Sequence, residues 1–238
     1  MEQGYIIAIE GTDGCGKNTQ AKLLKKELTN MGKKVFMCSF PNYSSVSSAP
    51  VKMYLNGELG NSANDTNAYQ ASTLFAVDRL CTYKTIIKPR LENGEIIILD
   101  RYTPSNALHQ ACKLSSTDEV DEFLNWLFDF EYNLLELPIP DKVFFLDVPT
   151  EVSENLRKLR EAQIALKSGE TNDIHEHDRT HLKKAYLTGK YVAQKYHWDQ
   201  INCLNEFGGL LSIKEIHKKM MDRLFADKDF CQAAQIEK

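Results

Sequence analysis

The stretch IAIEGTDGCGKNTQ, residues 7–20, decides how the rest of the chain is interpreted. It contains the spacing G-x-x-x-x-G-K, in which glycines let the backbone turn so that successive N–H groups point at phosphate oxygens and the lysine adds a positive charge. A short apolar run precedes the glycines and helical periodicity follows the lysine, which is the order of strand, loop and helix that such a site requires. The predicted phosphate-binding residues are Gly11, Gly14, Cys15, Gly16 and Lys17. We interpret Cys15 as a small residue that fills the loop rather than as a reactive thiolate.

One position of this pattern is unusual. A serine or threonine normally follows the lysine, because its hydroxyl joins the coordination shell of the magnesium ion of the nucleotide, but this chain has Asn18 there. Thr19 comes one position later, and its hydroxyl could face the nucleotide from the first helical turn. Two interpretations stay open: the metal contact has been relocated in a working enzyme, or the protein binds a nucleotide without turnover.

Composition limits the class of protein. A chain of 238 residues with 42% hydrophobic and 26% charged content is typical of one soluble globular domain. The formal net charge of -4 argues against a surface that binds nucleic acid polymers. No apolar run reaches the ~18 residues that span a bilayer, and the first residues lack the pattern of a signal peptide. We therefore expect a cytoplasmic protein without membrane contact. The six cysteines contain no C-x-x-C pair, so neither a zinc site nor a disulfide framework is indicated.

Short apolar, β-rich runs alternate with helical periodicity along the chain. The predicted strands are 5–10, 34–39, 95–100, 142–148 and 200–205. Such runs are typical of parallel strands that are covered on both faces, so we predict an α/β fold in three layers with a five-stranded parallel sheet. We expect a single domain over residues 1–238, with a lid-like excursion at about 153–178 and a loose C-terminal tail at about 227–238.

Five segments together resemble the thymidylate kinase family of P-loop nucleoside monophosphate kinases, from residue 5 to about 200. They are EGTDGCGKNTQ (10–20), FPNYSS (40–45), LFAVDR (74–79), LDRYTPSNALHQ (99–110) and DIHEHD (173–178). The resemblance implies a P-loop NTPase fold, Mg²⁺, and transfer of the γ-phosphoryl group of ATP to dTMP to give dTDP and ADP in dTTP synthesis. It also implies a homodimer through helices near Phe75 and Trp126. Some members of the family lack the hydroxyl after the lysine when a threonine follows, so the resemblance favours a working enzyme.

The donor and metal sites follow from the first and fourth segments. Asp100 ends an apolar strand, where sheets of this class present ligands, and an acidic residue there commonly orders the metal and its water; a helix cap or a surface salt bridge is the alternative. Asp13 matches the family acid near the sugar 3′-hydroxyl and the acceptor phosphate. The predicted metal ligands are Asp13, Asp100 and Glu176, and the predicted ATP-binding residues are Gly11, Gly14, Cys15, Gly16, Lys17, Asn18, Thr19 and Arg157.

Two arginines are candidates for the acceptor phosphate. The guanidiniums of Arg79 and Arg101 can bind phosphate oxygens in a fork and stay charged at any working pH, although either could instead be a solvated charge on a helix. Phe75 lies one helical turn before Arg79 on the same face, where it could stack on a pyrimidine or simply belong to the core.

Base selection is implied by the resemblance. Ser105 and Asn106 match positions that line the thymine pocket, where an amide can satisfy both O4 and N3–H of the ring. His109 stands at a position that is often aromatic, beside C2′ of the sugar, so selectivity for deoxyribose is weakened. Tyr43 follows Pro41 where many relatives have an arginine. The predicted dTMP-binding residues are Asp13, Pro41, Tyr43, Phe75, Arg79, Arg101, Ser105, Asn106, His109, Gln110 and Glu176.

The lid segment completes the expected machinery. Among its basic residues Arg160 is the first choice to act on the transition state, with a helix of solvated charges as the alternative. The predicted catalytic residues are Lys17, Arg101, Asp13 and Arg160. Three histidines near Glu176 could suggest a metal site, but they lack an apolar setting that excludes water. Other acceptors, namely dUMP, a modified pyrimidine deoxynucleotide or a nucleoside, stay open.

Overall fold

A computed structural model describes residues 4–60, 65–154, 156 and 179–236. Its centre is a sheet of five parallel strands in the order β2-β3-β1-β4-β5. The strands are β1 (Tyr5–Glu10), β2 (Val35–Ser39), β3 (Ile96–Asp100), β4 (Lys142–Asp147) and β5 (Asp199–Asn202). All five predicted strands are present, and the largest difference is at β5, which ends at Asn202 instead of 205. The predicted α/β class and parallel sheet are confirmed.

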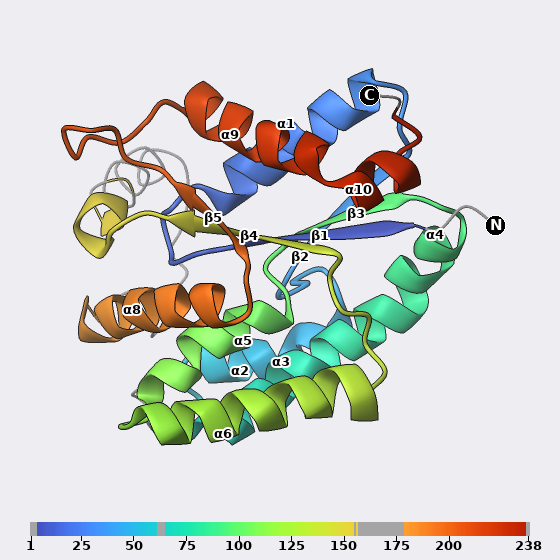
Figure 1. The fold of residues 1–238 in the computed structure, drawn as a ribbon. Coiled ribbons are helices and arrows are strands. Elements are labelled where there is room, and N and C mark those ends of the chain that lie inside the picture. The colour runs from blue at the N-terminus through green and yellow to red at the C-terminus, as the bar shows by residue number, and fades with distance from the viewer. Residues whose placement is uncertain (1–3, 61–64, 155, 157–178, 237–238) are drawn as a thin grey trace, which may run out of the picture.

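Helices cover both faces of the sheet (Figure 1). On one face lie α1 (Lys17–Asn30), α9 (Ile213–Ala226) and α10 (Lys228–Ala233). On the other face lie α2 (Ala49–Leu55), α3 (Ala68–Thr82), α4 (Lys88–Glu92), α5 (Thr103–His109), α6 (Thr117–Phe128) and α8 (Arg179–Lys195). Short helical turns join them: η1 (Val46–Ser48), η2 (Tyr83–Ile87), η3 (Ala111–Lys113) and η4 (Asp129–Leu134). The result is the predicted arrangement in three layers.

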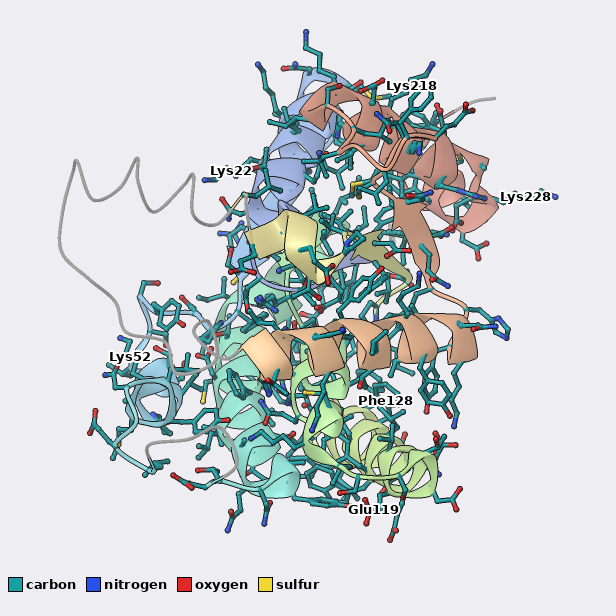
Figure 2. The ribbon with its side chains drawn as sticks, turned by 90° about the vertical axis from the view of Figure 1, so that its left-hand side faces the viewer. Lys22, Lys52, Glu119, Phe128, Lys218 and Lys228 are labelled. Atoms are coloured by element: carbon teal, nitrogen blue, oxygen red, sulfur yellow. The ribbon has the colours of Figure 1, made fainter. Side chains whose placement is uncertain are left out.

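Burial follows from this layering. Every residue of β1 and β3 is buried, because β1 lies between β3 and β4, and β3 lies between β1 and β2. Apolar runs rich in isoleucine, as in both strands, suit a sheet that is covered on both faces. Figure 2 shows Lys22 and Lys218 pointing outward from the layer of α1 and α9. Phe128, in contrast, lies between α6 and the end of α8, where its ring centroid is 4.8 Å from that of Tyr196.

The C-terminal residues differ from the expectation of a loose tail. Asp227 caps α10 by accepting hydrogen bonds from the backbone N–H groups of Asp229 and Phe230. The Phe230 ring is fully buried and meets the edge of the Tyr5 ring at 5.3 Å. Burial of this aromatic side chain and the helix cap both stabilise the segment against the body of the protein. The expected loose tail is therefore wrong for residues 227–236.

A buried carboxylate ties the end of β1 to the chain that follows β3. Glu10 is fully buried; its Oε1 accepts from the backbone N–H of Tyr102 at 2.7 Å, and its Oε2 accepts from the hydroxyl of Ser105 at 2.5 Å. The backbone N–H of Arg101 donates to the carbonyl oxygen of Ile9 at 3.2 Å. Burial raises the pKa of Glu10 to about 7, although the hydrogen bonds and the nearby Arg101 act in the opposite direction.

This pKa predicts a pH-dependent stability that Glu10→Gln removes. The folded state holds the proton more tightly than the unfolded state, whose pKa is 4.5. The contribution of Glu10 to stability is therefore fully present below pH 4.5 and is lost as the pH rises through 7, by roughly 3 kcal/mol. Urea unfolding of both proteins between pH 4.5 and 8 measures this, since the difference between them cancels other groups such as His109. Parallel pH curves for the two proteins would show that Glu10 is not protonated at pH 5 to 6.

Candidate active site

The loop between β1 and α1 is shaped by glycines. Gly14 and Gly16 have φ angles of 82° and 97°, in the left-handed region that favours glycine. A Cβ added at Gly16 would meet no atom within 4 Å, so its backbone conformation rather than crowding requires glycine there. Gly16 precedes the first residue of α1, and no side chain of the described residues caps this helix. The first N–H groups of α1 are therefore available to an anion, as a phosphate site needs.

Lys17 lies over this loop. Its side chain is buried, and its Nζ donates to the carbonyl oxygens of Gly11 and Thr12, each at 2.9 Å. A phosphate group in the loop would compete for the same ammonium protons. Burial raises the pKa of the Cys15 thiol even though Lys17 acts to lower it, which supports the interpretation of Cys15 as a small buried residue.

Asn18 lies beside the acidic residue that ends β3. Its Nδ2 donates to Oδ2 of Asp100 at 3.0 Å, although the two residues are 82 positions apart in sequence. The asparagine thus presents an N–H to a candidate metal ligand, whereas a hydroxyl would present an oxygen to the metal. Thr19 is exposed in the first turn of α1. The structure therefore brings two predicted site residues together, with Asn18 orienting the Asp100 carboxylate.

Arg101 follows Asp100 in an unusual conformation. Its φ of 71° is uncommon for a residue with a side chain, and such backbone strain is concentrated at functional sites. The hydrogen bond from its N–H to β1 holds this conformation in place. The side chain is consequently directed toward the phosphate-binding loop, where it meets Asp13.

The guanidinium of Arg101 connects several predicted site residues. Its Nη2 donates to Asp13, and its Nη1 lies 3.3 Å from the hydroxyl of Ser105 and 3.1 Å from Nε2 of His109. Burial acts to lower the pKa of Arg101, but the carboxylates of Asp13 and Glu10 raise it above its ordinary value. The cluster thus holds a permanent cation between the loop and α5.

His109 is neutral near pH 7 in this cluster. Burial, and secondly the charge of Arg101, lower its pKa well below 6.5. A neutral imidazole can accept the hydrogen bond from Arg101 through Nε2. On its other side the ring stacks on that of His181 in α8, with centroids 6.2 Å apart.

Arg79 lies apart from Arg101, in a buried ion pair. Its Nε and Nη2 donate to Oε2 and Oε1 of Glu131 at 2.6 and 2.5 Å, and both side chains are at most 1% exposed. Burial opposes its charge, but Glu131 outweighs this and raises the pKa of Arg79. This is neither a free phosphate ligand nor a solvated charge, so the phosphate role of Arg79 stays a prediction. Sequence reasoning missed Glu131, because it is one of three acidic residues in the segment FDFEYNLLEL and nothing local marks it as buried.

The loop with Pro41 and Tyr43 is held by a second residue that sequence reasoning missed. Asp78 is buried and accepts from the backbone N–H of Asn42 at 2.7 Å and from the hydroxyl of Ser47 at 2.6 Å. Its position directly before Arg79 in the motif LFAVDR was the available signal. Tyr43 remains 52% exposed. Asp78 therefore fixes this loop to α3.

Some of the remaining predicted residues lie in the described part of the chain, and the others do not. Phe75 is half-buried against the Tyr54 ring, with centroids 6.0 Å apart, and Oε1 of the buried Gln110 has no hydrogen-bond partner among the described residues. Arg157, Arg160 and Glu176 lie outside the described residues.

Among the residues that the structure describes, no three His, Cys, Asp or Glu side chains lie together in a way that could hold a metal ion. Every helix in the described part of the chain is too short or too polar to cross a membrane.

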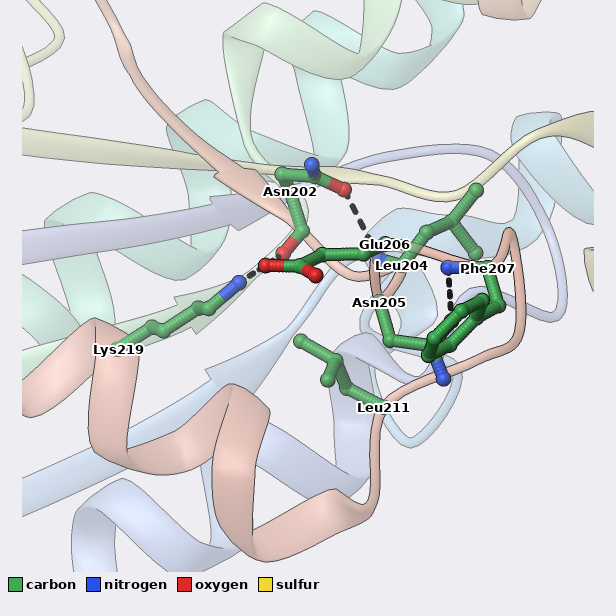
Figure 3. Close-up of a pocket in the computed structure, with 7 residues that line it drawn as sticks. All are labelled: Asn202, Leu204, Asn205, Glu206, Phe207, Leu211 and Lys219. Atoms are coloured by element: carbon green, nitrogen blue, oxygen red, sulfur yellow. Dashed lines mark hydrogen bonds between the residues drawn. The ribbon is translucent and has the colours of Figure 1, made fainter.

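An open pocket of about 540 Å³ lies beyond the end of β5 (Figure 3). It is lined by Asn202, Leu204, Asn205, Glu206, Phe207, Leu211 and Lys219. Lys219 reaches from α9 to the backbone oxygen of Asn202 at 2.8 Å. The pocket is at the carboxyl edge of the sheet, where α/β proteins bind their ligands, on the side of α1 and α9.

Comparison with known proteins agrees with this geometry. The thymidylate kinase family model matches residues 9–196. The chain is 35% identical over 149 residues to thymidylate kinase of Mycobacterium tuberculosis (strain ATCC 25618 / H37Rv), covering 62% of this chain and 68% of the relative. It is 35% identical over 159 residues to a probable thymidylate kinase of Pyrococcus horikoshii, covering 66% and 71%. It is 31% identical over 183 residues to thymidylate kinase of Thermosipho melanesiensis, covering 76% and 84%. The resemblance in the five sequence segments is therefore confirmed, and the chain belongs to the thymidylate kinase family.

Proposed function

We propose that the protein transfers the γ-phosphoryl group of ATP to dTMP, giving ADP and dTDP for dTTP synthesis. The observation that carries this proposal is the pairing of Asp13, in the phosphate-binding loop, with Arg101, at the start of the acceptor segment. This ion pair brings the loop that would bind the donor phosphates next to the cation that would bind the acceptor phosphate. Two phosphate sites side by side are what a nucleoside monophosphate kinase needs, because the transferred group must lie in line between two oxygens.

Charge stabilisation is the main task of the described residues. The N–H groups at the start of α1 and the ammonium of Lys17 would hold the donor phosphates. The guanidinium of Arg101 would hold the acceptor phosphate through a fork of two N–H groups. Both cations are held by the protein before any charge moves, which makes their stabilisation of the transition state effective. Arg160 stays a candidate for a further cation.

The residues at the end of β3 fit a magnesium ion. Asp100 offers a carboxylate that Asn18 orients, and oxygen is the ligand that this ion prefers. Thr19 is the adjacent hydroxyl in the sequence, and Asp13 and Glu176 are the other proposed acidic ligands. When bound, the ion would offset negative charge on the phosphoryl oxygens.

We propose that the acceptor base binds between α3 and α5. We propose that the half-buried ring of Phe75 stacks on the pyrimidine, while the buried side chain of Asn106 binds its edge. Gln110 offers a buried oxygen without a partner among the described residues. Ser105 and His109 lie around Arg101, beside the place of the phosphate and sugar.

A protein that binds nucleotide without turnover is the second candidate, because Asn18 replaces the usual hydroxyl. We also propose a homodimer through the helices that carry Phe75 and Trp126, and a cytoplasmic location. Trp126 is only partly buried and stacks on Phe130 with centroids 5.2 Å apart.

The reaction is tested by mixing the purified protein with MgATP and, separately, dTMP, dUMP, dCMP, the ribonucleotide of thymine and thymidine. We expect ADP and dTDP to form with dTMP at the highest kcat/KM, measured by chromatography of both products. Turnover of another acceptor but not of dTMP would overturn the substrate assignment. Nucleotide binding without ADP formation from any acceptor would favour the second candidate.

Lys17→Ala should lower turnover by at least ~10²-fold, because one preorganised charge at the moving phosphoryl group stabilises the transition state by roughly 3 kcal/mol. Lys22→Ala is the matched control, since Lys22 is exposed on the same helix. Steady-state assays and thermal unfolding of both variants provide the measurement. Near-normal turnover of Lys17→Ala would remove the assignment of the phosphate-binding loop.

Asn18→Ser should keep activity within about tenfold, because the variant exchanges an N–H donor to Asp100 for a hydroxyl and changes the barrier by about 1.4 kcal/mol or less. ADP formation by the two proteins across a magnesium titration tests this. A rescue by a hundredfold or more would instead identify the natural chain as a binder whose metal site asparagine has disabled.

A further inference from the structure

Glu131 is the centre of a buried hydrogen-bond network that the phosphoryl transfer described above does not use. It lies in η4, directly after α6, and is 0% exposed. Besides the two bonds from Arg79, its Oε2 accepts from the hydroxyl of Thr103 at 2.7 Å and its Oε1 accepts from Nδ2 of Asn106 at 3.3 Å. The donors come from α3 and α5, which lie beside α6 on one face of the sheet (Figure 1). All three donor residues are at most 2% exposed.

This network fixes which way the amide of Asn106 points. Its Nδ2 also lies 3.4 Å from the backbone oxygen of Ser72. A carboxylate and a carbonyl oxygen are acceptors only, so each can accept a hydrogen bond from the Asn106 amide when its nitrogen faces them, and neither can when the amide is flipped. The flipped amide would set its oxygen against two buried oxygens, which is costly in an interior of low dielectric constant. Nδ2 therefore faces two acceptors of the protein, and Oδ1 is the atom that Asn106 offers to a ligand.

Arg79 allows a buried carboxylate to orient the amide of Asn106. A buried carboxylate without a cation is strongly disfavoured, and the two-pronged pair with Arg79 supplies the opposite charge. A neutral glutamine in its place would carry an N–H₂ group of its own, and it could face Asn106 with either end. The charge of Glu131 thus makes this position acceptor-only.

We propose that Glu131 is a positioning residue for base recognition, which acts through Asn106 and makes that amide an acceptor only. This rests on the proposed function, in which Asn106 binds the base. N3 of thymine carries a hydrogen and N3 of cytosine does not, so an acceptor-only amide binds the first and repels the second. The sequence predicts that one amide satisfies both O4 and N3–H of the base. Because Nδ2 faces Glu131 and Ser72 instead, we assign only the contact with N3–H to Asn106.

The test is the acceptor selectivity of Glu131→Gln. We expect the ratio of kcat/KM for dTMP to kcat/KM for dCMP to fall by at least about tenfold, since discrimination by a buried polar group is lost when its partner can reorient. The fall in kcat/KM for dTMP should come mainly from a higher KM for dTMP, whereas the KM for ATP should not change. Asp199→Asn is the matched control, because it removes a carboxylate from a pair with Lys142 at 2.9 Å on the far strands of the sheet.

The outcomes separate the two proposals. If the natural protein does not phosphorylate dTMP, the proposed function fails, whereas an unchanged selectivity ratio in an active Glu131→Gln variant overturns the role of Glu131 alone. A change of the ratio in Asp199→Asn of the same size would also overturn it. Should Glu131→Gln fail to fold, NMR of the natural protein decides: the Nδ2 protons of Asn106 should stay protected from solvent exchange with and without dTMP. Rapid exchange of these protons would overturn the proposal.

Discussion

The hydrogen bonds that the buried carboxylate of Glu10 accepts hold the two halves of the site together. Glu10 is the last residue of β1, the strand that leads into the phosphate-binding loop. Its partners, Tyr102 and Ser105, follow Arg101 in the chain. The loop proposed to bind the donor phosphates and the Arg101 cation proposed to bind the acceptor phosphate are thereby held at one edge of the sheet. Burial of the Glu10 carboxylate and the uncommon backbone conformation of Arg101 both cost folding free energy. In return, the charged groups of the site are held in fixed positions.

Both cations of the site donate to oxygens of the protein itself. Lys17 donates to carbonyl groups of its own loop, and Arg101 donates to Asp13. When a nucleotide binds, its phosphate oxygens would replace these protein oxygens as hydrogen-bond acceptors. Neither cation would need to change its side-chain rotamer. This arrangement keeps the charged groups hydrogen-bonded at every stage, and it explains why a carboxylate is tolerated inside an anion-binding loop.

Local patterns predicted the elements, whereas contacts between distant segments did not follow from them. The strands and the loop were found because apolar runs and glycine spacing are short-range signals. The pairing of Asn18 with Asp100, and of Arg79 with Glu131, joins residues 82 and 52 positions apart. Arg79 was expected either to bind phosphate or to be solvated, because nothing in the motif LFAVDR shows that a carboxylate will be buried beside it. The helix α10 was missed for a similar reason, since its order depends on Phe230 reaching Tyr5 at the other end of the chain.

One continuous site for both nucleotides is tested most directly with a single molecule in which five phosphates join adenosine to thymidine. Isothermal titration calorimetry should give one analogue per chain, bound at least roughly a hundredfold more tightly than ADP or dTMP alone, because the second half binds as an intramolecular event. The analogue should displace both nucleotides. Two analogues per chain, or displacement of only one nucleotide, would contradict a shared site at this edge of the sheet.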